Sequence, residues 1–402
     1  MADNKDKKVL NVPALRFPEF NGEWITRPIK DIADFIGGGT PSSANEAYWQ
    51  GTIPWVSSSD IVEDNINDIT ISRYITEEAI SNSATKLCSA PVILIVSRVG
   101  VGKVALSSKA ICTSQDFCNL INIKVHPTFL AYSLSQIMKR KSIEVQGTSI
   151  KGITSLEIQK IILHIPSLQE QHKISDLFQL IDKRIAVQSK IIEKYESLIQ
   201  AIIYKAKMDG IRKGTWRRID LCKILQERNE KNVEGRTICS VSVSQGVVNQ
   251  IEYLGRSFAA KQTSHYNVVK YGDIVYTKSP TGDFPYGIIK RSNIREDVAV
   301  SPLYGVYIPV NDSMGVILHF YFMQPSNAIN YLHPLIQKGA KNTINITNER
   351  FLENSVPLPI SESEANTIAG ILKTIQAKIE IEKSLLQSYI KEKEYLLRQM
   401  FI

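Results

Sequence analysis

The sequence is poor in cysteine and has no long apolar run. Its five cysteines are odd in number and include no C-x-x-C pair, which argues against a disulfide framework and against a thiolate zinc site. No run of about 18 apolar residues occurs, so no membrane-spanning helix is expected. Residues 1–8 are polar and charged, unlike a secretory signal peptide. We therefore expect free thiols in a cytoplasmic protein.

Motifs that carry catalysis or bind cofactors are also missing. Residues 100–103 (GVGK) resemble the end of a phosphate-binding loop, but Ser97 replaces its first glycine and Val104 replaces the hydroxyl that holds magnesium. His164 and His172 are too far apart for a zinc pair on one helix face. There is no Asn-Pro-Pro-aromatic loop of the amino-methyltransferase kind and no nuclease carboxylate–lysine cluster. The sequence thus favours binding without catalysis, with no catalytic or metal-ligating residue.

Size and charge narrow the class of protein further. The chain has 402 residues, of which 43% are hydrophobic, enough for two domains with separate cores. The net charge of +8 and the pI of about 9.0 favour an anionic partner such as nucleic acid or a membrane surface. Charge alone does not decide between them, because many basic proteins bind neither.

An internal repeat dictates the architecture. An Ile-Thr pair ending at Thr154 recurs at Thr347, and each pair precedes an apolar segment that closes with a proline, Pro166 or Pro359. The same 193 residues separate the two threonines and the two prolines. Because these landmarks recur in one order at one offset, we expect a duplicated chain with two similar domains.

Each proline is followed by a long helical pattern. Apolar residues recur at spacings of three and four over about 40 residues, which is typical of a coiled-coil seam. Ser167 and Ser361 stand where helix caps are needed, and Glu364 completes a capping-box pattern with Ser361. A helix of about 60 Å cannot bury a single apolar stripe alone. We expect the two helices to pack antiparallel, as a rod with a domain at each end, although pairing between molecules is also open.

These patterns predict an α+β fold. Two similar mixed α/β domains of mostly β character, opened by Trp24 and Trp216, are each followed by a long helix, and the helices form an antiparallel coiled coil. Val92–Val96 is predicted as a buried strand and residues 129–141 as a helix. The predicted boundaries are an N-terminal tail (1–20), the first domain (21–150), a central strand and helix (151–212), the second domain (213–345), and a distal strand and helix (346–402).

Several motifs add a family resemblance. They are residues 37–41 (GGGTP), 48–49 (YW), 53–56 (IPWV), 97–103 (SRVGVGK), 147–150 (GTSI) and 169–174 (QEQHKI). With the doubled architecture, they resemble the target-recognition domains of type I restriction-modification specificity (S) subunits, from about Val12 onward. The second half departs from the motifs: residues 277–280 (TKSP) replace the Ser-Arg turn, and residues 338–342 (KGAKN) replace the Gly-Thr-Ser loop. Such differences are expected of domains that read different half-sites.

The resemblance implies a function. Each domain would read one half of a bipartite site in double-stranded DNA, and the helices would set the spacing and dock two modification (methyltransferase) subunits. Restriction (endonuclease/translocase) subunits would join them. S-adenosylmethionine, ATP and Mg²⁺ would serve those subunits, with none expected in this chain. Two other interpretations remain open: a coiled-coil scaffold or adaptor with two protein-binding heads, and a specificity subunit of another restriction class.

Candidate DNA contacts lie in loops near strand ends, since Arg can hold guanine edges and Lys or Ser can hold phosphate. In the first domain they are Trp55, Ser57, Arg98, Lys103, Thr148, Ser149 and Lys151. In the second domain they are Lys261, Lys278, Arg291, Lys341 and Asn342. The tryptophans are expected in the core rather than as base-stacking platforms. Exposed apolar positions beside the seam are candidates for subunit docking, unless they complete the helix packing: Ile192, Ile203 and Leu386.

Overall fold

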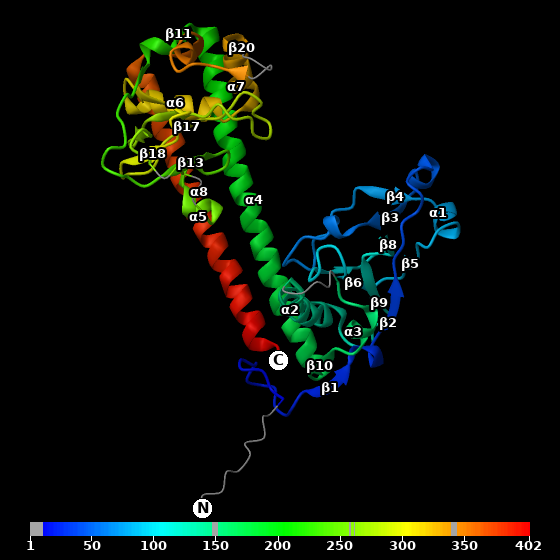
Figure 1. Cartoon of the computed structure of the whole chain (residues 1–402). Helices are drawn as coiled ribbons and strands as arrows, with labels where there is room; N and C mark the ends of the chain where they lie inside the picture. Colours follow the sequence, from blue (N-terminus) through cyan, green and yellow to red (C-terminus); the bar gives the residue numbers. More distant parts are fainter. Residues whose placement is uncertain (1–10, 147–151, 257–258, 261, 339–343) are drawn as a thin grey trace, which may run out of the picture. The chain divides into compact units, whose positions relative to one another are not determined.

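The computed structural model describes residues 11–146, 152–256, 259–260, 262–338 and 344–402 (Figure 1). The chain divides into two compact units. The first runs to Gln188 and includes Leu385–Ile402, and the second is Ser189–Ser384. Each unit therefore contains one α+β domain together with a segment of each long helix, as the sequence predicts. No helix among the described residues is long and apolar enough to cross a membrane.

The first domain is built from short strands and few helices. Its strands are β1 (Ile25–Pro28), β2 (Asp34–Gly37), β3 (Ile53–Val56), β4 (Arg73–Ile75), β5 (Leu87–Cys88), β6 (Val92–Val96), β7 (Val104–Ser107), β8 (Ile111–Thr113), β9 (Phe117–Ile121) and β10 (Ile162–Ile165). Its helices are η1 (Ile29–Asp31), η2 (Glu46–Trp49), η3 (Ser58–Asp60), α1 (Glu77–Ser81), α2 (Pro127–Gln146) and α3 (Ser155–Gln159).

Two four-stranded sheets enclose the core of this domain. One has the order β2-β9-β6-β7 and the other β4-β3-β8-β5. Strand β6 is buried on both faces: Ile93 and Ile95 pack with α2, and Leu94 packs with residues of the second sheet. This double burial explains the continuous apolar run of β6 and confirms the buried strand predicted there. Strand β10 pairs with β1 and so closes the domain on itself.

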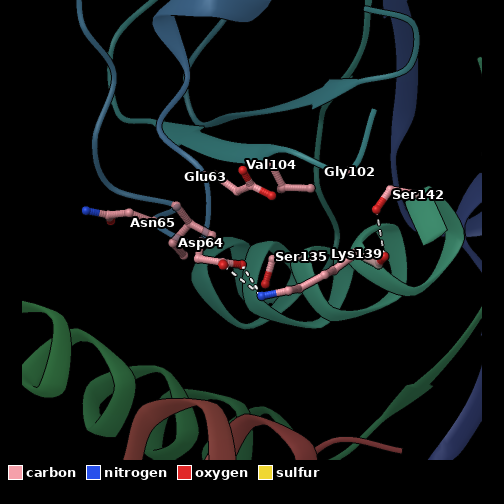
Figure 2. Close-up of a pocket in the computed structure, with 9 residues that line it drawn as sticks. Glu63, Asp64, Asn65, Gly102, Val104, Ser135, Lys139 and Ser142 are labelled. Carbon is pink, nitrogen blue, oxygen red and sulfur yellow. Dashed lines mark hydrogen bonds and ion pairs between the residues drawn. The ribbon is translucent and has the colours of Figure 1, made fainter. Parts of the chain in front are cut away.

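A loop between η3 and β4 lies beside α2. Lys139 of α2 forms an ion pair with Asp64 in this loop, and its Nζ lies 2.7 and 2.8 Å from the two carboxylate oxygens (Figure 2). The pocket between them has a volume of about 10 Å³, lined partly by Gly102 and Ser142. Such a space holds at most one water molecule, so it is not a ligand site.

The second domain repeats part of the order of elements. Its strands are β11 (Trp216–Asp220), β12 (Leu225–Glu227), β13 (Cys239–Ser242), β14 (Gly246–Asn249), β15 (Asn267–Val269), β16 (Ile274–Tyr276), β17 (Ile289–Arg291), β18 (Val298–Val300), β19 (Gly305–Pro309), β20 (Gln337–Lys338), β21 (Ile344–Asn345) and β22 (Ser355–Pro359). Its helices are η4 (Leu221–Lys223), α5 (Gln250–Leu254), α6 (Asp312–Phe322), α7 (Pro325–Leu332), η5 (His333–Leu335) and η7 (Arg350–Leu352).

The strand order shows that the two domains share the topology of one sheet and of the closing strand pair. The sheet β12-β19-β16-β17 has the order of β2-β9-β6-β7, and the pair β11-β22 matches β1-β10. Equivalent hydrogen bonds also recur: Thr154 Oγ1 accepts from the Glu157 amide and Thr347 Oγ1 from the Arg350 amide, both at 3.2 Å. These caps explain why the Ile-Thr pairs recur. The other strands differ, since β13-β14 and β15-β18 form separate two-stranded sheets.

The long helices are α4 (Leu168–Lys213) and α8 (Glu362–Met400). Both begin at the predicted caps: Ser167 Oγ accepts from the Glu170 amide at 3.3 Å and Ser361 Oγ from the Glu364 amide at 3.5 Å. The Glu364 carboxylate, however, accepts from the indole of Trp216 at 2.8 Å, so the reciprocal half of the predicted capping box is replaced by a tie to the second domain.

Contacts within each unit show that the helices run antiparallel. In the first unit Asp182 pairs with Lys393, and the Arg184 guanidinium lies 4.4 Å from the ring of Tyr389. In the second unit Glu196 pairs with Lys383 at 3.2 Å, and residues 206–213 share a pocket with residues 364–368. Gly210 is required there, because a Cβ atom would lie 1.9 Å from Cδ1 of Trp216.

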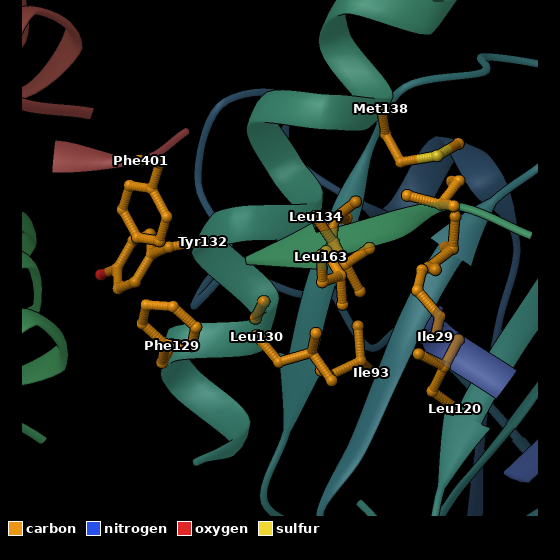
Figure 3. Close-up of a cluster of buried hydrophobic side chains, with 14 of the residues drawn as sticks. Ile29, Ile93, Leu120, Phe129, Leu130, Tyr132, Leu134, Met138, Leu163 and Phe401 are labelled. Atoms are coloured by element: carbon orange, nitrogen blue, oxygen red, sulfur yellow. The ribbon is translucent and has the colours of Figure 1, made fainter. Parts of the chain in front are cut away.

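The end of α8 is built into the core of the first unit. Leu397, Met400 and Phe401 belong to the same buried cluster as α2 (Figure 3). The Phe401 ring stacks on Phe129 at 5.3 Å and lies 5.8 Å from Phe178. The first domain therefore completes its core with residues from the far end of the chain.

This packing predicts a stability effect. Replacing Phe401 by Ala should lower the free energy of unfolding of the first unit by about 3–5 kcal/mol, because it leaves a cavity between aromatic rings. Denaturation followed by tryptophan fluorescence reports mainly on this unit, which holds Trp24, Trp49 and Trp55 among the four tryptophans. The exposed neighbour Ile402 is the control, and equal effects of the two alanine substitutions would contradict the packing.

Candidate nucleic-acid interface

The turn between β6 and β7 presents the first candidate residues. Gly100 and Gly102 have φ values of +84° and +110°, which side chains rarely adopt, so the turn depends on glycine. Arg98 is exposed and has no hydrogen-bond or ion-pair partner among the described residues. Lys103 instead donates to the backbone oxygens of Ser58 and Ile61 at 3.3 and 3.0 Å. Arg98 is thus available to a ligand, whereas Lys103 is already engaged in holding η3.

Lys103 holds a second candidate loop, which begins at Ser57. Ser57 caps η3, and the Asp60 carboxylate accepts from the Ser57 amide at 2.7 Å. Asp60 also pairs with Arg73, whose guanidinium lies 4.5 Å above the ring of Trp55. Trp55 is only 3% exposed and donates its indole N–H to the Gly39 oxygen at 2.9 Å. Trp55 is therefore a buried support for Arg73, in line with the expected core location of the tryptophans.

Arg73 is a half-buried cation that sequence reasoning did not single out. Its position depends on the register of β3 and β4, in which Trp55 lies opposite Arg73. Nothing in the local sequence around Arg73 indicates this pairing. A guanidinium stacked on an aromatic ring and held by a carboxylate has a fixed orientation, which suits directional hydrogen bonding.

Several candidates fall outside the described residues: Thr148, Ser149, Lys151, Lys261, Lys341 and Asn342. The structure describes the chain again from residue 152, just after the segment that contains Thr148, Ser149 and Lys151. Ile153 donates its amide to the Ser97 oxygen at 2.8 Å, and Gly152 lies beside the same residue. Residues 152–153 therefore lie next to the β6–β7 turn that carries Arg98.

The two candidate residues of the second domain that the structure describes, Lys278 and Arg291, differ in exposure. Lys278 follows β16, is half-buried, and has its pKa lowered by burial. Arg291 is only 3% exposed, pairs with Asp312 and Asn293, and lies 4.6 Å from the ring of Tyr271. The Arg291 side chain thus leaves almost no surface for DNA, and its visible role is to join β17 to the start of α6.

Comparison with known proteins decides the family. The family model for the type I restriction modification DNA specificity domain matches residues 21–197 and again 222–390. The chain belongs to this family. Its two specificity domains correspond to the two halves of the structural repeat, each including part of a long helix.

Two curated relatives are type I specificity subunits. The MjaIX specificity subunit of Methanocaldococcus jannaschii is 32% identical over 184 residues, 43% of this chain and 41% of that protein. The EcoR124I/EcoR124II specificity subunit of Escherichia coli is 28% identical over 210 residues, 46% of this chain and 50% of that protein. The chain therefore spans half or less of the length of the relatives that it matches.

A solved structure shares the fold. The type I restriction-modification S subunit from M. genitalium superposes with a TM-score of 0.60 at 15% sequence identity, covering 97% of this chain and 99% of that one. At this identity the likeness concerns the fold alone. It agrees with two specificity domains that are each followed by a long helix.

The helix positions chosen for subunit docking are mostly not exposed. Ile192 and Ile203 are 7% and 1% exposed, so they do not stand exposed beside the seam, and their burial agrees with the alternative expectation that they complete the helix packing. Leu386 is half-buried. The apolar residues that the specificity-domain helices expose are others, among them Leu180, Val187, Leu198, Met208, Ile371 and Ile381. Sequence periodicity could not distinguish the buried from the exposed apolar residues, because it gives the direction of the apolar stripe on a helix but not the width of the stripe that is buried.

Chemistry within the described residues is limited. Among them no group of three or more His, Cys, Asp or Glu side chains is placed to hold a metal ion. Cys88, Cys112 and Cys239 are buried free thiols, and burial raises their pKa values to about 11, 12 and 11. Thiols held in the protonated form are poor nucleophiles and poor metal ligands.

A buried lysine lies next to Arg291 in the second specificity domain. Lys290 is 3% exposed, and burial lowers its pKa to about 8. The neighbouring His319 accepts from the Arg291 amide at 3.1 Å, and burial together with the charges of Lys290 and Arg291 lowers its pKa to about 3. His319 is therefore neutral, and Lys290 is charged at neutral pH at a cost in stability.

The pKa of Lys290 sets a testable pH dependence. The pKa of Lys290 in the folded state is about 8, below the usual 10.5. Between these two pH values the unfolded chain binds more protons than the folded chain, so the stability rises with pH. Lys290→Met should stabilise the second unit at pH 7 by up to about 3 kcal/mol, and by less at pH 10. Hydrogen exchange resolved by peptide measures this. The exposed Lys223→Met is the control, and an equal gain at both pH values would rule out the charge as the cause.

Proposed function

We propose that the chain is the DNA-sequence-specificity subunit of a type I restriction-modification enzyme. Each specificity domain would read one half-site of a bipartite sequence in double-stranded DNA. The observation that carries the proposal is the repeat: one sheet order and one closing strand pair occur twice, each copy matches the specificity-domain family, and each is followed by a long helix. A duplicated reader with diverged loops suits a site whose two halves differ in sequence.

The candidate contacts give each reader a physical basis. In the first domain the exposed Arg98 and the stacked Arg73 are cations with donors suited to guanine edges or phosphate. In the second domain Lys278 follows the strand equivalent to β6. The net charge of +8 adds a general attraction for DNA that falls with salt concentration.

The partners follow from the same proposal. Two modification subunits would dock on the surface of α4 and α8, where several apolar side chains are exposed. These subunits would methylate adenine with S-adenosylmethionine, and restriction subunits would add ATP- and Mg²⁺-dependent translocation and cleavage. The specificity subunit itself would contribute recognition and no reacting group.

Methylation mapping tests the proposal directly. Co-expressed with the modification subunit encoded beside it, the chain should direct adenine methylation to a split motif, two short half-sites around a fixed unread gap. Long-read sequencing of the host genome reveals such a motif. Exchanging residues 21–150 for those of another family member should change one half-site only. An assembled complex that binds S-adenosylmethionine but adds no methylation would favour the protein-binding scaffold instead.

A second prediction concerns the spacing between half-sites. We propose that α4 and α8 set this spacing, since two readers on one duplex need a fixed separation. Four residues inserted into each helix, at 188/189 and at 384/385, add about 6 Å, or about two base pairs of 3.4 Å. The recognised spacer should lengthen while both half-sites stay the same. A changed half-site with an unchanged spacer would contradict this role, and an insertion in one helix alone serves as the control for mispairing.

A further inference from the structure

Asp182 of α4 collects three donors from three different parts of the first unit. Lys393 Nζ of α8 lies 2.6 Å from one carboxylate oxygen. Tyr132 of α2 and Asn67 of the loop before β4 donate to the other at 2.7 and 2.8 Å. The side chains of Asp182 and Lys393 are each 10% exposed, so this ion pair is largely shielded from water. A carboxylate held in this way fixes the direction of every element that bonds to it.

The same loop is tied a second time. Lys393 Nζ also donates to the backbone oxygen of Asp64 at 2.9 Å. The Asp64 side chain meanwhile pairs with Lys139 of α2 (Figure 2). Residues 64–67 are therefore bonded to α2, α4 and α8 at once, and we call this set of contacts the Asp182 clamp.

The clamped loop leads directly into the candidate interface. An isolated bridge joins Ile61 to Ile69, and the Thr70 amide donates to the Asp60 oxygen at 2.9 Å. Asp60 in turn holds Arg73, as described above. A short hydrogen-bonded segment thus links the polar contacts of the helices to the loop that carries Ser57 and Arg73.

Apolar packing alone would hold the domain on the helices without fixing its rotation. The contact of Leu397 is non-directional, since apolar burial depends on area and hardly on angle, and only the stacking of Phe401 on Phe129 adds a geometric preference. Buried polar groups at a helix seam have a different effect: they select one register and one partner, because any other arrangement leaves a charge unpaired. The apolar contacts therefore hold the first domain on the helices, and the Asp182 clamp fixes the orientation of the domain relative to them.

The two charged residues of the clamp do not recur at the equivalent positions of the second repeat. At the positions 193 residues away, Ile375 stands in place of Asp182 and Gln200 in place of Lys393. In the second unit the ion pair that joins the domain to a long helix, Lys373 of α8 with Asp312 of α6, has side chains that are 46% and 45% exposed and so is well solvated. The buried Asp182–Lys393 pair is therefore not a feature that the repeat preserves, which suits a task specific to the first domain.

We propose that Asp182 is a positioning residue that holds the first recognition domain at one rotational setting against α4 and α8, and thereby restricts the spacer length that the complex accepts. The inference rests on the proposed function. Each added base pair moves a half-site by about 3.4 Å and rotates it by roughly 35°. A recognition domain that is free to rotate could still bind a half-site displaced in this way. A domain held by the clamp could not, so the complex would reject sites with the wrong spacer length.

The test compares methylation rates on synthetic duplexes whose half-sites are separated by the native spacer, by one base pair fewer and by one base pair more. The complete complex is used with Asp182→Ala, Asp182→Asn, Lys393→Met and Tyr132→Phe. In Asp182→Ala we expect the rate ratio of native to off-length sites to fall about tenfold. Tyr132→Phe, which removes only the hydroxyl, should lower the ratio less. General instability would lower all rates together and leave the ratio unchanged.

Lys383→Ala is the matched control, because it breaks an exposed pair between the same two helices and should leave the ratio at its wild-type value. If Asp182→Ala does not assemble, Asp182→Asn and Tyr132→Phe carry the test, since both keep the shape of the buried side chain. Assembled variants that discriminate spacers as the wild type does would overturn the inference. A wild-type complex with no bipartite motif would instead overturn the proposed function, so the two failures are distinguishable.

Discussion

The structure depends on the burial of one apolar stripe on each of two long helices. Neither α4 nor α8 can hide its stripe alone. Each unit buries apolar residues of both helices, such as Phe178 and Leu397 in the first unit and Ile203 and Leu372 in the second. Because the helices come from the two halves of a duplicated chain, this pairing forces each half to contribute to the other's unit. The first domain then packs on both helices, through Phe178 of α4 and Phe401 after α8.

The two halves of the chain share their structural framework but differ in their loops. The four-stranded order, the threonine caps and the closing strand pair recur in both halves. The parts that differ are the second sheet and the turns at strand ends, where the candidate DNA contacts lie. Because the shared sheet stays constant while the turns vary, each domain can acquire its own DNA specificity without a change of fold. Sequence changes in loops are tolerated better than changes in the core.

Sequence reasoning succeeded where the cause of structure is local. The caps at Ser167 and Ser361, the buried strand β6 and the repeated Thr-to-proline spacing all follow from nearby residues. It failed where the cause is a distant partner. Arg73 acquires its place from the register of β3 and β4, and the Asp182–Lys393 pair joins residues on separate helices. The sequence left open whether Ile192 and Ile203 are exposed or complete the helix packing, because burial beside a seam depends on the neighbouring side chains.

The late position of Leu397, Met400 and Phe401 in the chain has a consequence for synthesis. The first domain emerges first from the ribosome, yet its buried cluster stays open until the entire second domain has been translated. The second unit has no such dependence and closes with residues up to Ser384. A chain that stalls between residues 384 and 397 would therefore carry a folded second domain together with an exposed apolar surface, the kind of surface that chaperones and proteases recognise.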